Sequence, residues 1–133
     1  MASIRREIAT KASVETAWDA IRDVGALHTR LVPGFVTDTK LEAGARIVTF
    51  ANGMIARELI VDLDDSGHRL VWSVVGGRMT HHNASVQVFP ETGGGCRIVW
   101  IADLLPDELA PAITGMIEQG MASMQATLNA SAM

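Results

Sequence analysis

Two ionisable side chains, Glu58 and His82, are the residues of this sequence best suited to chemistry. A carboxyl group and an imidazole can act together as general acid and general base, and the ordinary imidazole pKa of about 6.5 suits both roles near neutral pH. Such a pair would serve aldol-type cyclisation, dehydration or enolisation of a ketone. The structural alternative is that His82 lies in water at the end of a sheet while Glu58 pairs with Arg57 or Arg78. Both interpretations stay open, so the sequence does not decide whether the chain is an enzyme.

Other catalytic chemistries lack the residues that they need. His81 and His82 are adjacent, and adjacent residues of a strand point to opposite faces, so the two cannot bind one metal ion in the usual way. Cys96 has no histidine nearby in sequence that would favour a thiolate. The glycine run 93–95 lacks the lysine and the following serine or threonine of a phosphate loop. We therefore expect no metal and no cofactor.

Composition and charge narrow the class of protein. The chain has 133 residues, of which 48% are hydrophobic and 20% charged, as in an ordinary folded domain, so we predict a single domain over residues 1–133. The 11 basic and 15 acidic residues give a net charge of -4 and form no basic cluster, which argues against a nucleic-acid partner. A single cysteine and the lack of any long apolar run favour a cytoplasmic protein with no membrane partner.

The pattern of apolar residues predicts a strand, two short helices, six further strands and a long helix. The first strand covers 4–8 and ends before Ser13, which is a good N-cap for a helix that places Trp18 on its apolar face. A second short helix covers 26–31 and ends at Pro33. The strands that follow are separated by turn residues and cover 35–41, 47–50, 54–63, 69–75, 82–89 and 96–104. Short connections of this kind indicate an antiparallel meander.

The last segment carries one apolar stripe at helical spacing. Because proline is tolerated only in the first turn of a helix, the main helix begins near Pro111, after a turn at 107–109. The stripe consists of Ile113, Met116, Ile117, Gly120, Met121, Met124 and Leu128. Only this helix can cover the apolar face of the sheet, so we predict an α+β fold in which a curved antiparallel sheet of about seven strands wraps around the C-terminal helix.

Residues at the joints of this pattern resemble a known superfamily over nearly the whole chain. The stretches that carry the resemblance are Arg57-Glu58-Leu59, Leu63-Asp64-Asp65, Val74-Val75-Gly76-Gly77, Phe89-Pro90-Glu91 and Val99-Trp100-Ile101. They resemble the START-like, or SRPBCC, superfamily, which includes Bet v 1, the polyketide cyclase/dehydrase group and the plant abscisic-acid receptors. The resemblance implies the helix-grip fold, with a pocket between sheet and helix, and it implies that Glu58 faces this cavity. It implies no single activity, because many functions share the fold.

The sequence departs from the abscisic-acid receptors at the positions that bind their hormone. Their gate segment is replaced by the short run 51–54, and the lysine that pairs with the hormone's carboxylate has no counterpart near 27–31. A tyrosine and a serine of their pocket correspond to Ala84 and Val86. The resemblance therefore favours a cavity more apolar than theirs and argues against a hormone receptor.

Alternation along the strands and the helical stripe predict which side chains face the pocket. The residues predicted to bind a ligand there are Trp72, Val74, Ala84, Val86, Trp100, Met116, Ile117, Gly120 and Met121. His82 shares the inward face of its strand with these residues. We expect the pocket to bind a hydrophobic or aromatic small molecule, with acid/base activity of the polyketide cyclase/dehydratase kind through Glu58 and His82. The alternative is a non-catalytic carrier or sensor for a lipid or another small molecule.

Two strands give ambiguous patterns. On 54–63, Leu59, Val61 and Leu63 look like inward residues and would take Arg57 with them. The resemblance instead turns Glu58 inward. On 96–104 both faces are largely apolar, because the alternate positions 99 and 101 are valine and isoleucine. These two would be covered in a homodimer, but isolated exposed aliphatic residues are also common on protein surfaces.

Overall fold

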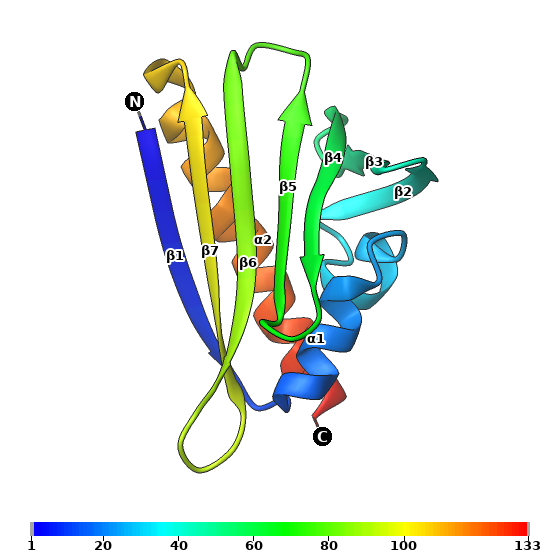
Figure 1. The fold of residues 1–133 in the computed structure, drawn as a ribbon, viewed down its shortest axis with the longest axis vertical. Helices are drawn as coiled ribbons and strands as arrows, with labels where there is room; N and C mark the ends of the chain where they lie inside the picture. The colour runs from blue at the N-terminus through cyan, green and yellow to red at the C-terminus, as the bar shows by residue number, and fades with distance from the viewer. Residues whose placement is uncertain (1, 133) are drawn as a thin grey trace.

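The computed structural model describes residues 2–132, which form one seven-stranded antiparallel sheet and the helices packed on it (Figure 1). The strands are β1 (Ala2–Thr10), β2 (Val36–Glu42), β3 (Ala45–Phe50), β4 (Ile55–Asp64), β5 (Arg69–Val75), β6 (His81–Pro90) and β7 (Cys96–Leu105). The helical elements are α1 (Val14–Arg22), the short segments η1 (Leu27–Leu31) and η2 (Asp107–Leu109), and α2 (Ala110–Ser131). The predicted domain also includes Met1 and Met133, which lie outside the described residues.

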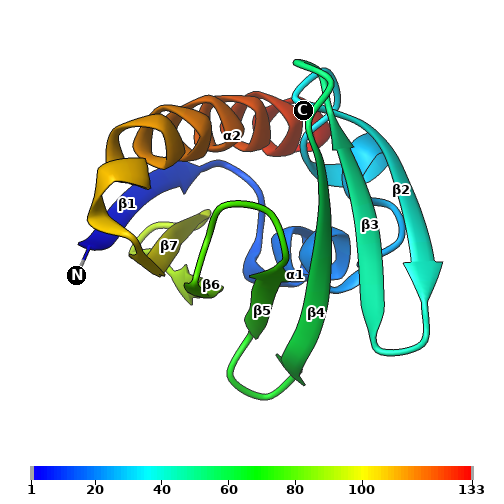
Figure 2. The same ribbon diagram turned by 90° about the horizontal axis from the view of Figure 1, so that it is seen from above.

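The sheet is strongly curved, and α2 lies along its concave side (Figure 2). The strand order is β1-β7-β6-β5-β4-β3-β2, so the strands from β2 to β7 form a meander and β1 pairs with β7 at its end. This architecture confirms the helix-grip fold predicted from the sequence. Each predicted strand is present, and its bounds lie within two residues of the predicted ones.

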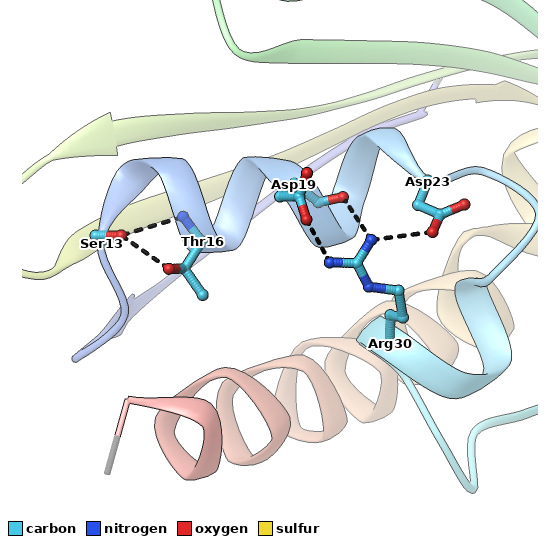
Figure 3. A network of polar contacts seen from close by, with 5 residues as sticks. All are labelled: Ser13, Thr16, Asp19, Asp23 and Arg30. Carbon is cyan, nitrogen blue, oxygen red and sulfur yellow. Dashed lines mark hydrogen bonds and ion pairs between the residues drawn. The ribbon is translucent and has the colours of Figure 1, made fainter.

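The segment that follows α1 differs in type from the short helix predicted there. α1 itself begins as expected, because the Ser13 hydroxyl accepts a hydrogen bond from Thr16 N at 3.1 Å (Figure 3). η1 is a π-helical turn, closed by a hydrogen bond from Val32 N to Leu27 O at 3.0 Å. Apolar spacing alone does not distinguish this wider turn from an α-helical one over so few residues.

A cluster around Arg30, which we call the Arg30 clip, ties η1 to α1. The guanidinium of Arg30 donates to the carboxylate and the carbonyl oxygen of Asp19 and, at 2.9 Å, to Asp23 Oδ2 (Figure 3). The Arg30 side chain is 39% exposed, so the clip lies at the surface. Because Leu27 and Leu31 are on the segment that it holds, the clip positions side chains that line the interior cavity described below.

The apolar stripe of α2 packs against the sheet as predicted. Ile117, Met121, Met124 and Leu128 are each at most 3% exposed. At Gly120 the helix approaches so closely that a β-carbon would lie 3.0 Å from the Trp100 ring. Glycine at this position therefore allows α2 to lie close to the concave face.

A β-bulge in β4 explains the ambiguous pattern of that strand. The register of β4 against β5 shifts between Ile60 and Asp62. Before the bulge Glu58 stands opposite Val74, and after it Leu63 packs against the core. The extra residue of the bulge reverses the alternation of side chains along the strand. Glu58 and Leu63, which a regular strand would point to opposite faces, can therefore both lie on the concave side.

Candidate ligand cavity

A cavity of about 430 Å³ lies between the concave face of the sheet, η1 and α2. Cavities that bind small molecules commonly measure about 300–1,000 Å³. Most of the lining is apolar and includes Leu31, Phe35, Trp72, Val86 and Ile113. The ionisable residues of the lining are Arg46, Glu58, Arg78 and His82.

Arg46, Glu58 and His82 lie in one row across the sheet, which we call the cavity row. Arg46 of β3 stands opposite Glu58 of β4, and Glu58 stands opposite Val74 of β5. Val74 N donates to Nδ1 of His82 on β6 at 3.0 Å, which extends the row by one strand. Because neighbouring strands lie about 4.8 Å apart, the backbones at Glu58 and His82 are separated by about 10 Å.

Arg46 and Glu58 form a buried ion pair within the cavity row. Arg46 Nε donates to Glu58 Oε1 at 2.8 Å, and the two side chains are only 4% and 7% exposed. Arg46 Nη1 also donates to the carbonyl oxygen of Val24 at 3.3 Å. The partner of Glu58 is thus neither Arg57 nor Arg78, the two arginines that the sequence suggested.

His82 is buried rather than placed in water at the end of the sheet, with 8% of its surface exposed. Burial lowers the pKa of its imidazole from 6.5 to about 4, an effect that His81 increases and Asp103 opposes. Since Nδ1 accepts the hydrogen bond from Val74 N, we assign the proton of the neutral ring to Nε2. His82 therefore differs from the ordinary histidine expected from the sequence: it is a neutral hydrogen-bond donor at physiological pH.

Glu58 and His82 line the same cavity, but within residues 2–132 no hydrogen bond joins them. The carboxylate of Glu58 is engaged by Arg46, and the charged groups that act on the His82 pKa are His81 and Asp103. The structure thus places both candidates at the predicted pocket and about two strands apart. Their acid/base role stays a prediction.

The apolar residues predicted for the pocket fall into two groups. Those that line the cavity are Trp72, Val74, Val86, Trp100, Met116 and Ile117. Those that are buried without lining it are Ala84, Gly120 and Met121. The rings of Trp72 and Trp100 meet edge to face with their centres 5.7 Å apart, and the Arg46 guanidinium lies 5.7 Å from the centre of the Trp72 ring. Aromatic surface therefore continues up to the ion pair.

The sequence-based prediction missed Arg46, because the strand that carries it was expected to begin one residue later. A signal was present, since a buried carboxylate needs a partner and β3 stands directly beside β4. Phe35 and Phe50, whose ring centres lie 5.4 Å apart, also line the cavity and were not predicted. Nothing in their spacing distinguishes aromatic side chains that line a cavity from those that fill a core.

The two aliphatic residues of β7 on the outer face of the sheet differ in exposure. Val99 is only 6% exposed and Ile101 38% exposed. Both line a depression together with Arg5, Arg69 and Arg97. The predicted homodimer, which would cover this face, stays a prediction, as does the cytoplasmic location.

Residues 2–132 contain no group of three or more histidine, cysteine, aspartate or glutamate side chains that could hold a metal ion. Within the same residues, no helix has the length and apolar character needed to cross a bilayer.

Comparisons with known proteins agree with the resemblance seen in the sequence. A family model described as polyketide cyclase / dehydrase and lipid transport matches residues 1–129. No curated protein matches the chain. Among solved structures, XoxI from Bacillus cereus is 18% identical with a TM-score of 0.86, and 96% of each chain is covered.

Two other solved structures share the fold. A START superfamily protein from Mycobacterium smegmatis is 10% identical with a TM-score of 0.74, over 98% of this chain and 96% of that one. A truncated norcoclaurine synthase from Thalictrum flavum is 18% identical with a TM-score of 0.74, over 96% of this chain and 92% of that one. At these identities the likeness shows a shared fold.

Proposed function

The chain belongs to the polyketide cyclase / dehydrase and lipid transport family, and on this premise we propose that its cavity binds a hydrophobic or aromatic small molecule. The observation that carries the proposal is a largely apolar cavity of about 430 Å³ enclosed by sheet, η1 and α2. Trp72 and Trp100 offer flat surfaces to an aromatic guest, and Met116 offers a flexible, polarizable one. Such a lining accepts guests by shape and contact area.

We further propose that the protein acts as a carrier or sensor rather than as a catalyst. A general base needs a free lone pair or carboxylate oxygen within reach of the proton that it removes. Here Glu58 Oε1 is occupied by Arg46, and His82 Nδ1 is occupied by Val74 N. A guest would therefore find no free lone pair on the neutral His82 ring, and a Glu58 carboxylate that already balances the charge of Arg46.

Acid/base catalysis of the cyclase/dehydratase kind is the second candidate, and the spacing within the cavity row favours it. The backbones at Glu58 and His82 lie about 10 Å apart, so a single ring could contact both side chains. In such a complex His82 Nε2 would donate to a ketone oxygen, and Glu58 would accept the proton from the neighbouring carbon. The ketone would leave this step as an enolate that keeps the hydrogen bond from His82 Nε2, with the transferred proton on Glu58.

Binding is tested by calorimetric titration of the purified protein with acetylnaphthalene, an uncharged aromatic ketone. We expect saturable binding that Val86→Phe weakens about tenfold or more, because the larger ring would occupy part of the cavity. Val61→Phe is the matched control, since Val61 is 57% exposed on β4. Equal effects of the two substitutions, or no binding to the unaltered protein, would contradict the proposal.

Catalysis is tested with the same ketone in heavy water, where enolisation replaces the protons of the acetyl methyl group by deuterium. A carrier leaves the exchange rate, followed by NMR, at that of protein-free buffer. If the protein accelerates exchange and Glu58→Gln removes the acceleration, the carrier proposal is wrong and the catalytic one is supported.

A further inference from the structure

The buried ion pair of Arg46 and Glu58 is not needed for binding by shape and contact area alone. A buried pair costs desolvation energy, and an apolar pair of similar volume is often no less stable. Arg46 bonds to Glu58 through Nε and to Val24 through Nη1, whereas its Nη2 donates to no residue in the described part of the chain. The guanidinium thus lines the cavity with part of its donor capacity unused.

The interior of the cavity carries no net charge where a guest would lie. Glu58 neutralises Arg46 at 2.8 Å. His82 presents the Nε2 donor of an uncharged ring, since Nδ1 accepts from the backbone. The remaining ionisable lining residue, Arg78, is exposed in the turn after β5, where water and salt screen its charge.

We propose that Glu58 is a specificity-determining residue: by occupying Arg46 it makes the cavity select uncharged guests that carry a hydrogen-bond acceptor and reject carboxylates. This inference rests on the proposed binding function. It assigns Glu58 a role that requires no proton transfer.

The rejection of carboxylates follows from the charge balance. A carboxylate that enters the cavity loses its hydration, and only a cation within reach can compensate that loss. Arg46 is the buried cation of the lining, and Glu58 already neutralises it. An anionic guest would bring a second carboxylate to one guanidinium, and the two negative charges would repel each other at short range.

An uncharged acceptor meets no such obstacle. A carbonyl or ether oxygen carries little charge to desolvate and can accept from Arg46 Nη2 or from His82 Nε2. The rest of the guest then contacts the aromatic surface of Trp72, which lies directly beside the guanidinium. The selected class is therefore an apolar, often aromatic, ketone, ester or ether.

The test compares two guests of nearly the same shape, acetylnaphthalene and the naphthoate anion, by calorimetric titration at neutral pH. We expect the unaltered protein to bind the ketone at least about tenfold more tightly than the anion. Glu58→Gln should raise the affinity for naphthoate, relative to that for the ketone, by about tenfold or more, because Glu58 no longer neutralises the charge of Arg46. Glu42→Gln removes the same charge from an exposed pair and should change neither.

A double variant, Arg46→Gln with Glu58→Gln, should lose the gain in naphthoate affinity, because no cation is left to bind the anion. If Glu58→Gln alone is poorly folded, naphthoate should raise its melting temperature more than the ketone does. Equal affinity of the unaltered protein for both guests, or a Glu58→Gln variant that naphthoate neither binds nor stabilises, would overturn the inference and leave the binding function intact. Failure of the unaltered protein to bind either guest would overturn both.

Discussion

Two arginines of this protein are paired with carboxylates in opposite environments. In the Arg30 clip the arginine side chain is 39% exposed, and its partners Asp19 and Asp23 are 64% and 46% exposed (Figure 3). In the cavity row, Arg46 and Glu58 are 4% and 7% exposed. Water competes for every hydrogen bond of the clip. Little water reaches the buried pair, so each of its charges relies on the other for compensation. The same chemical groups therefore hold a helical segment in one place and set the polarity of a cavity in the other.

The largest effect that this comparison predicts is the loss of one buried charge. Arg46→Met leaves Glu58 buried without a partner and should lower the free energy of unfolding by about 3–5 kcal/mol. Urea denaturation of the two proteins measures the difference. The combination of Arg46→Met with Glu58→Leu should recover most of the loss, because no buried charge remains. A double variant as unstable as the single one would show that the pair itself, rather than the unpaired charge, governs stability.

His82 provides a second, smaller effect from the same row. The unfolded chain binds a proton at His82 below its ordinary pKa of 6.5, whereas the folded chain binds it only below about 4. The burial of neutral His82 therefore contributes fully to the free energy of unfolding above pH 6.5, and this contribution is lost as the pH falls from 6.5 to 4. The loss amounts to at most about 3 kcal/mol, at 1.36 kcal/mol for each unit of pKa shift.

The His82 effect is isolated by comparing unfolding free energies of the unaltered protein and His82→Gln between pH 7 and pH 4. Carboxylates titrate in both proteins, so their contributions cancel in the difference. We expect the unaltered protein to lose stability more steeply than the variant over this window. His81→Gln should keep most of this steepness, because burial is the larger cause of the lowered His82 pKa and His81 only adds to it. Parallel curves for the unaltered protein and His82→Gln would mean that His82 is not buried in its neutral form.

The two regions also differ in how far the sequence predicts them. The concave face of β6 followed from simple alternation, because no bulge interrupts its pairing with β7 from His81 to Pro90. The same reasoning was ambiguous on β4, since a bulge after Ile60 reverses the parity. Arg46 was missed because strand ends are poorly marked in a sequence, and the pairing of Arg46 with Glu58 depends on register between strands. The fold follows from local patterns, but the site also requires the register.

The smallest predicted effect concerns the Arg30 clip. Arg30→Ala should lower the free energy of unfolding by only about 0.2–1 kcal/mol, because exposed ion pairs gain little over the hydration of their separate charges. Salt at about 1 M reduces the Debye length to about 3 Å, so the difference between the two proteins in urea denaturation should shrink there. The loss of unfolding free energy caused by Arg46→Met should stay nearly unchanged in the same salt, because the pair of Arg46 and Glu58 is buried. Arg30→Ala could instead lower the free energy of unfolding as much as Arg46→Met does, with as little response to salt. That result would mean that position in the fold, rather than exposure to water, decides what an arginine contributes.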